Sequence, residues 1–98
     1  MTKAHEPITP GEILLTEFLE PLGITQYRLA QATGLPQTRI SEIVRGKRAI
    51  SIGTALRLSK ALGVDDRFWI NIQTDFDLEV ERDLHAEDLA KVTTLVAS

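Results

Sequence analysis

The chain has 98 residues, of which 43% are hydrophobic and 26% charged, a composition typical of one globular domain with a modest core. It contains no cysteine, which excludes disulfide frameworks, thiolate zinc sites and thiol nucleophiles. No apolar run approaches the ~20 residues of a membrane-spanning helix, and the first ten residues lack a secretion signal, so we expect a cytoplasmic protein with no membrane partner.

The charge is distributed unevenly along the chain. The net charge is −3 overall, but residues 25–60 carry seven basic residues against one acidic residue, Glu42, for a net charge of +6. Residues 1–24 have a net charge of −3, and residues 61–98 have a net charge of −6. This division favours an anionic partner at the middle of the chain and suits a cationic partner elsewhere, although an uneven surface without partners also explains it.

The first predicted helix begins after Thr9, a favourable N-cap residue. Pro10 suits the first helical position, because proline has no N–H to leave unpaired there. The apolar stripe of this helix consists of Ile13, Leu14, Phe18 and, as a further candidate, Leu22. Pro21 disfavours helical geometry at the residue before it, and Gly23 is expected to end the helix.

Three further predicted helices are each followed by a glycine. They cover residues 25–33, 36–45 and 51–62, before Gly34, Gly46 and Gly63. A fifth helix is expected to start with Asp65 as its N-cap. Its aromatic and apolar residues, which we assign to the core, are Phe68, Trp69, Ile72 and Phe76.

The helical pattern weakens after Leu78, and residues 79–88 are acidic. The spacing of Leu89, Val92 and Val96 predicts a short sixth helix, while the β-branched run at 92–96 is also compatible with a strand. We therefore divide the chain into an N-terminal arm (1–8), a helical domain (9–78) and an acidic tail (79–98). The apolar positions of the tail either pair across a dimer axis or fold back on the fifth helix.

Short loops and the lack of convincing strands indicate an all-α domain of four or five helices. Within it, the segment from Thr25 to Gly46 has the features of a helix-turn-helix. Ala30 allows a crossing helix to come close, and Gly34 supplies a positive φ at the turn. The inward face of the second of these helices consists of Ile40, Ile43 and Val44.

The opposite face of the helix at 36–45 is polar, and its residue types can read base edges in a DNA groove. In helix-turn-helix proteins the N-terminal part of the second helix does most of this reading. The predicted base-reading residues are Gln37, Thr38 and Arg39, with Ser41 and Glu42 as weaker candidates. For Glu42, an ion pair with Arg39 or Arg45 is favoured over a contact with cytosine.

Phosphate contacts are expected at the edges of this surface, where they fix register without reading sequence. The candidates are Gln26, at a helix start that attracts anions, and four basic residues: Arg28, Arg45, Lys47 and Arg48. Arg57 and Lys60 are interpreted as solvated charges. The chain has no nucleophile motif, no Gly-rich phosphate loop and no metal-ligand spacing, so we expect neither an enzyme nor a cofactor or metal.

Several short motifs form a recognisable set, and the first and the last of them are not demanded by a generic helix-turn-helix. They are Pro10-Gly11-Glu12-Ile13-Leu14, Glu20-Pro21-Leu22-Gly23, Arg39-Ile40-Ser41-Glu42-Ile43, Gly46-Lys47-Arg48, and Phe68-Trp69 with Asn71 and Gln73. Through these motifs the chain resembles, over residues 8–78, the HigA (VapI-like) antitoxins. That family belongs to the larger group of phage-repressor and Cro-like helix-turn-helix proteins.

The resemblance implies a five-helix, lambda repressor-like domain that binds an inverted-repeat operator in double-stranded DNA as a homodimer and represses its own operon. It also implies a second partner, a HigB-like toxin of the RelE group of messenger-RNA endonucleases. The family's DNA-reading positions fall on Gln37, Thr38, Arg39 and Ser41, and its backbone-binding positions on Gln26, Arg45, Lys47 and Arg48. Two alternatives stay open: a stand-alone regulator without a toxin, and a protein-interaction module that no longer binds DNA.

Overall fold

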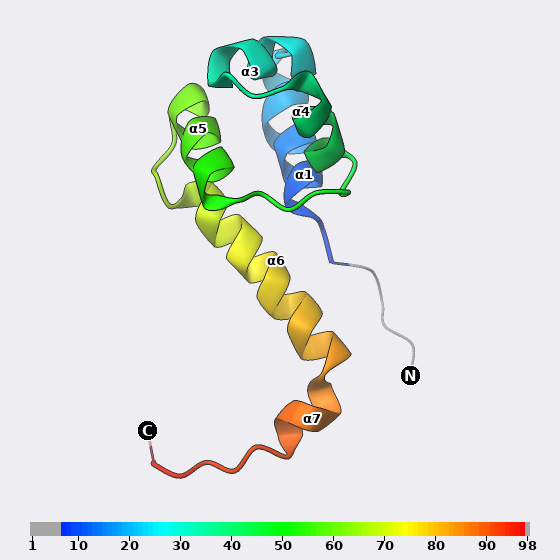
Figure 1. Ribbon diagram of the computed structural model, residues 1–98, viewed down its shortest axis with the longest axis vertical. Coiled ribbons are helices and arrows are strands. Elements are labelled where there is room, and N and C mark those ends of the chain that lie inside the picture. Colours follow the sequence, from blue (N-terminus) through cyan, green and yellow to red (C-terminus); the bar gives the residue numbers. More distant parts are fainter. Residues whose placement is uncertain (1–6, 98) are drawn as a thin grey trace.

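The computed structural model describes residues 7–97, and all regular secondary structure in this range is helical. The short helices of the N-terminal two thirds form one group, and α6 leads away from it toward α7 and the C-terminal end (Figure 1). The all-α fold class is thereby confirmed. Residues 1–6 of the predicted N-terminal arm lie outside the described residues. In the described range no helix is both long and apolar enough to cross a membrane.

The first helical segment runs without a break through α1 (Pro10–Ile13), η1 (Leu14–Leu19) and α2 (Glu20–Leu22). As predicted, Thr9 caps it, because its Oγ1 accepts the Glu12 N–H at 3.1 Å. Gly23, with a φ of 66°, follows its last residue. The sequence therefore correctly located both ends of this segment.

The π-helical element η1 changes the buried face of this segment. The Glu20 N–H bonds to the Leu15 carbonyl five residues earlier, which adds one residue to the turn. A proline cannot donate to the helical ladder, and the widened turn before Pro21 lets the helix continue past it. The added residue places Leu19 in the core, whereas Leu22 is 61% exposed. The assignment of Leu22 to the apolar stripe is wrong for this reason.

The next three helices, α3 (Gln26–Thr33), α4 (Gln37–Val44) and α5 (Ile52–Leu62), match the predicted ones within a residue at each end. The hydroxyl oxygens of Thr25 and Ser51 accept N–H groups in the first turns of α3 and α5. By contrast, α4 starts after Pro36 without a side-chain cap.

The long helix α6 (Phe68–Leu84) differs from the prediction at both ends. The carboxylate of Asp65 accepts the Arg67 N–H at 2.8 Å in a turn, so the helix begins only at Phe68 and Asp65 is not its N-cap. At the other end it continues past Leu78, because the charged residues there are good helix formers. The short C-terminal helix is α7 (Ala86–Ala90), and residues 91–97 form neither a helix nor the alternative strand.

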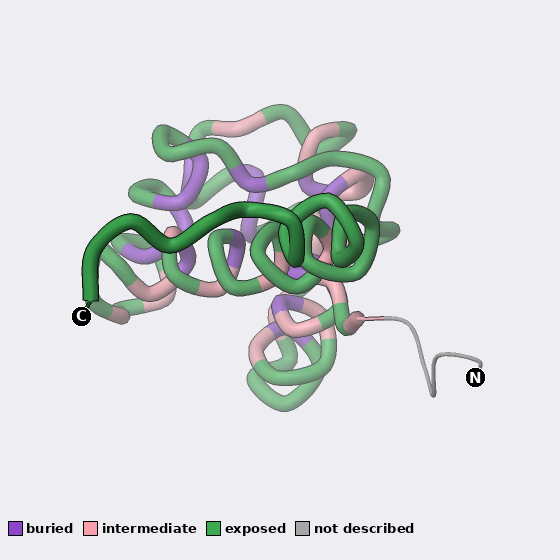
Figure 2. The backbone as a smooth tube through the Cα atoms, turned by 90° about the horizontal axis from the view of Figure 1, so that it is seen from below, coloured by how far each residue is buried: buried purple, intermediate pink, exposed green. Residues whose placement is uncertain are grey.

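The core lies where η1, α3, α4, α5 and the start of α6 meet. Figure 2 shows the buried stretches gathered inside the group of short helices, with the C-terminal part of the chain exposed. Its largest fully buried side chains are Trp69, Leu14, Leu29, Ile40, Ile43 and Leu58. The Trp69 ring packs against Phe18 and Phe68, with centroids 5.2 and 5.1 Å away. This confirms the assignment of Trp69 to the core. Every described residue after Val80 is exposed, so the C-terminal part adds nothing to this core.

The first turn of α1 packs against the backbone of α4. Gly11 is buried, and a Cβ atom at this position would overlap the carbonyl group of Ile43. Glycine therefore permits an approach of the two helices that any side chain would prevent. This contact fixes the C-terminal turn of α4 relative to the rest of the core.

We predict that Gly11→Ala lowers the free energy of unfolding by about 1–3 kcal/mol or more, because the added methyl group meets backbone that has little room to move. Gly53→Ala in α5 is the matched control, since no atom lies within 4 Å of a Cβ there. The control should keep or slightly raise the stability, because alanine favours helices. Thermal unfolding by circular dichroism measures both, at roughly 4–8 °C of Tm per kcal/mol. An unchanged Tm for Gly11→Ala would contradict the close helix crossing.

Candidate nucleic-acid interface

The predicted helix-turn-helix consists of α3, a three-residue turn and α4. Leu29 and Ala30 on α3 are buried, as are Ile40 and Ile43 on α4, so the two helices share one core. Leu35, in the turn, is half-buried and packs against the same cluster. The apolar positions named from the sequence therefore do the packing that this motif needs.

Arg57 of α5 braces the turn between the two helices. Its Nη1 donates to the Thr33 carbonyl oxygen at 2.6 Å, and the Thr33 Oγ1 accepts the Leu35 N–H at 3.3 Å. The guanidinium thus lies at the C-terminal end of α3, where unpaired carbonyl groups favour a cation. The interpretation of Arg57 as a solvated charge is therefore wrong. Its partner is 24 residues away in the sequence, beyond the reach of any local pattern.

All five predicted base-reading residues lie within the first six positions of α4. Gln37 and Thr38 are exposed, whereas Arg39, Ser41 and Glu42 are half-buried. Two isoleucines on the opposite side of the helix are fully buried. The structure therefore presents a polar face on a helix whose other face is held in the core.

α4 ends in a glycine turn that leads into the basic loop, which we define as residues 45–49. The Gly46 N–H bonds to the Ile43 carbonyl at 3.0 Å, and the Lys47 N–H bonds to the Glu42 carbonyl at 2.8 Å. This is the Schellman pattern, and Gly46 supplies the left-handed conformation that it needs, with a φ of 74°. The turn sends Arg48 back alongside the last turns of α4.

The Arg48 Nε donates to the Glu42 Oε1 at 2.7 Å. The predicted ion pair of Glu42 with Arg39 or Arg45 is therefore wrong. Helical spacing favours partners three or four residues away, but the glycine turn brings in a partner six residues away. Arg45 instead directs its Nε at the Ser41 carbonyl oxygen, at 3.4 Å. Two of the predicted phosphate-binding arginines thus already have partners within the protein.

The remaining predicted phosphate-binding residues lie on other parts of this surface. Gln26 is half-buried at the first position of α3, and Arg28 is exposed two residues later. Lys47 is exposed in the basic loop. The structure therefore divides the phosphate candidates between the start of α3 and the end of α4 with its loop.

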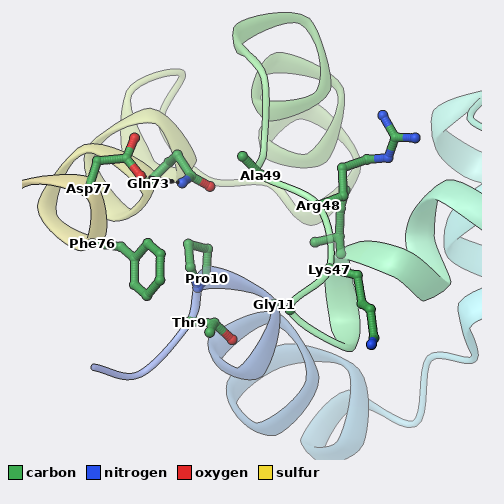
Figure 3. A pocket seen from close by; sticks show the side chains of 11 residues that line it. Thr9, Pro10, Gly11, Lys47, Arg48, Ala49, Gln73, Phe76 and Asp77 are labelled. Carbon is green, nitrogen blue, oxygen red and sulfur yellow. Dashed lines mark hydrogen bonds between the residues drawn. The ribbon is translucent and has the colours of Figure 1, made fainter. Parts of the chain in front are cut away.

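Gln73 of α6 holds the chain just after the basic loop. Its Oε1 accepts the Ile50 N–H at 2.8 Å, and its Nε2 donates to the Asp77 Oδ1 at 2.9 Å. Figure 3 shows Gln73 and Asp77 on one side of the loop, with the side chains of Lys47 and Arg48 extending away from them. The loop is thus anchored on its inner side and leaves its cationic groups outward.

The anchoring role of Gln73 was not predicted from the sequence, where this residue is only one member of the Phe68-Trp69 motif. The spacing of the sequence could have indicated this role. Gln73 follows Trp69, a core residue, by four positions, so both lie on the buried face of α6. A buried amide needs hydrogen-bond partners, which points to a nearby backbone group. Asn71, the other polar residue of that motif, is exposed.

These features define a helix-turn-helix protein of the repressor-like class. The sequence matches the helix-turn-helix family over residues 15–69. The chain is 47% identical to Virulence-associated protein I of Dichelobacter nodosus over 73 residues, which cover 74% of this chain and 68% of the relative. It is 38% identical to Antitoxin HigA-1 of Vibrio cholerae over 94 residues, which cover 96% of this chain and 89% of the relative.

The fold is also similar to the Pseudomonas aeruginosa antitoxin HigA, whose structure was solved with the higBA promoter. The TM-score is 0.85 at 32% sequence identity, and the match covers 92% of this chain and 99% of the other. The chain belongs to the HigA (VapI-like) family of helix-turn-helix proteins.

We predict that Gln73→Met, which keeps the volume but removes both hydrogen bonds, destabilises the protein by about 1–3 kcal/mol, because it leaves the Ile50 N–H unpaired. Native-state hydrogen exchange should show faster exchange of the Ile50 amide than in the wild type. Asn71→Ala, an exposed amide on the same helix, is the control and should change neither quantity. Unchanged protection at Ile50 would show that Gln73 does not anchor the loop.

Proposed function

We propose that the protein is a transcriptional repressor that binds an operator in its own promoter with α4 in the major groove. The observation that carries this proposal is the polar outward face of α4, in the part of the chain where the net charge is +6. A basic loop follows this face directly, as phosphate binding beside a recognition helix requires. The solved structure of the P. aeruginosa antitoxin HigA with the higBA promoter supports promoter DNA as the partner.

The first three residues of α4 would read the bases. Gln37 suits adenine, the Thr38 methyl group suits a thymine methyl, and Arg39 suits guanine. Ser41 and Glu42, which lie further from the start of the helix, are the weaker candidates. The residues assigned to the phosphates are Gln26, Arg28, Arg45, Lys47 and Arg48.

A dimer would form through the C-terminal part of α6, α7 and the residues after them. This part of the chain carries large apolar side chains that are exposed: Leu78, Leu84, Leu89, Val92, Leu95 and Val96. Exposed apolar groups gathered in one region mark protein interfaces. A two-fold dimer requires an inverted-repeat operator with half-sites about 34 Å apart. Sedimentation equilibrium should show a dimer, and a monomer at every concentration would contradict this step.

As an antitoxin, the protein would also bind and neutralise a HigB-like toxin of the RelE group. The name of the V. cholerae relative supports the antitoxin role, and the acidic segments at 1–24 and 61–98 suit a basic partner. Co-expression with the product of the adjacent reading frame tests this role. Relief of growth arrest supports the antitoxin, whereas continued arrest beside intact repression favours the stand-alone regulator.

The DNA-binding proposal is tested by mobility shift with the gene's own upstream DNA, unrelated DNA and two salt concentrations. We expect tighter, salt-sensitive binding to the upstream DNA. Arg39→Ala should cost about 1–3 kcal/mol and relax the preference at one base pair. Lys47→Gln should weaken binding to all sequences alike and reduce the salt slope by about 1.

Two results would contradict parts of this proposal. If Arg39→Ala keeps the sequence preference intact, the assigned register of α4 on the bases is wrong. If the protein shows no salt-dependent DNA binding at all, it is instead a protein-interaction module. The charge of +6 over residues 25–60 argues against that module, because a helix that faces only protein has no need of it.

A further inference from the structure

Glu42 is the one acidic residue among residues 25–60, and it lies on the outward face of α4. Its Oε1 is 2.7 Å from the Arg48 Nε, and the side chains of Glu42 and Arg48 are 39% and 48% exposed. A carboxylate on a face that approaches phosphates opposes the binding of any DNA sequence. A contact with cytosine would offset this cost at one base pair of the operator, but it does not account for the ion pair of Glu42 with Arg48.

The backbone brings the two charged groups together in the protein alone. The Lys47 N–H is bonded to the Glu42 carbonyl, and the left-handed conformation of Gly46 returns the chain toward α4. The guanidinium of Arg48 extends away from α6, on the outer side of the loop (Figure 3). The pair is thus both preformed by the turn and accessible from solvent.

We propose that Glu42 is a specificity-determining residue that withholds Arg48 from the phosphates of unrelated DNA. This inference rests on the proposed function of operator binding. Exposed ion pairs are weak, so a phosphate held in the right place can replace the carboxylate as the partner of Arg48. Base contacts hold α4 in register only on the operator, and there they keep a phosphate within reach of Arg48. On unrelated DNA, Arg48 stays paired with Glu42 and does not contact a phosphate.

The variant E42Q tests this proposal, because it keeps the shape of the side chain and removes its charge. Arg48 then becomes available to any DNA, so the affinity for unrelated DNA rises more than the affinity for the operator. One additional phosphate contact steepens the salt slope for unrelated DNA by about 0.9, and a bound dimer with one such contact in each protomer shows about twice that change. The ratio of operator affinity to unrelated affinity should fall about threefold or more at low salt.

Matched variants separate this effect from a general change in charge. D66N makes the same charge change in the turn before α6 and should leave the affinity ratio at its wild-type value. In the R48Q background, E42Q should raise the affinity for unrelated DNA much less than it does alone. All variants should melt within a few degrees of the wild type, because the pair is exposed.

The possible failures are distinguishable from one another. If the wild type itself does not prefer the operator, the proposed function is wrong. If the wild type prefers the operator but E42Q and D66N give the same affinity ratio, this inference alone is overturned. It is also overturned if E42Q raises the affinity for unrelated DNA equally with and without Arg48.

Discussion

The missing side chain at Gly11 allows α1 to rest on the backbone of the last turn of α4, and the basic surface depends on this contact. The Ile43 carbonyl group that faces Gly11 also accepts the Gly46 N–H that closes the turn after α4. Thr9, which caps α1, lies beside Gly46. A Cβ atom built at Gly46 would be 3.4 Å from the Thr9 Cγ2. The start of α1 thus contacts and positions the end of α4 and the turn that follows it.

Two long-range hydrogen bonds complete the support of the helix-turn-helix. Arg57 holds the turn before α4 through the Thr33 carbonyl, and Gln73 holds the chain after the basic loop through the Ile50 N–H. Helix α4 is therefore fixed at its start, along its buried face and at its end. Base reading needs such support, because a binding group displaced by about 1 Å loses much of its effect.

Local sequence patterns were sufficient for the first four predicted helices and their ends, but not for the bounds of α6 or for the contacts between helices. The cap at Thr9 and the turns at Gly34, Gly46 and Gly63 depend on neighbouring residues and were predicted correctly. The exposure of Leu22 was missed, because it follows from a π-helical turn that has no clear sequence signal.

The misassigned side chains of the site share a different cause. Arg57 and Gln73 bond to groups 24 and 23 residues away, and Arg48 reaches Glu42 only because of the turn between them. Such pairings arise from packing, so spacing along one helix does not indicate them. The outward face of α4 was predictable, since the buried isoleucines fix which residues lie opposite.

The central claim is that the start of α4 enters the major groove, and site-directed cleavage of operator DNA tests it most directly. Because the chain has no cysteine, Thr38→Cys provides a single point for attaching an iron chelate that cleaves nearby DNA. Asp66→Cys, exposed in the turn before α6 and outside the proposed DNA and dimer surfaces, is the control. Figure 1 shows that α4 and the start of α6 belong to different parts of the fold. We expect cleavage from position 38 at two places about one helical turn apart, and none from position 66. Equal cleavage from both positions, or none from position 38 in a bound complex, would contradict the account.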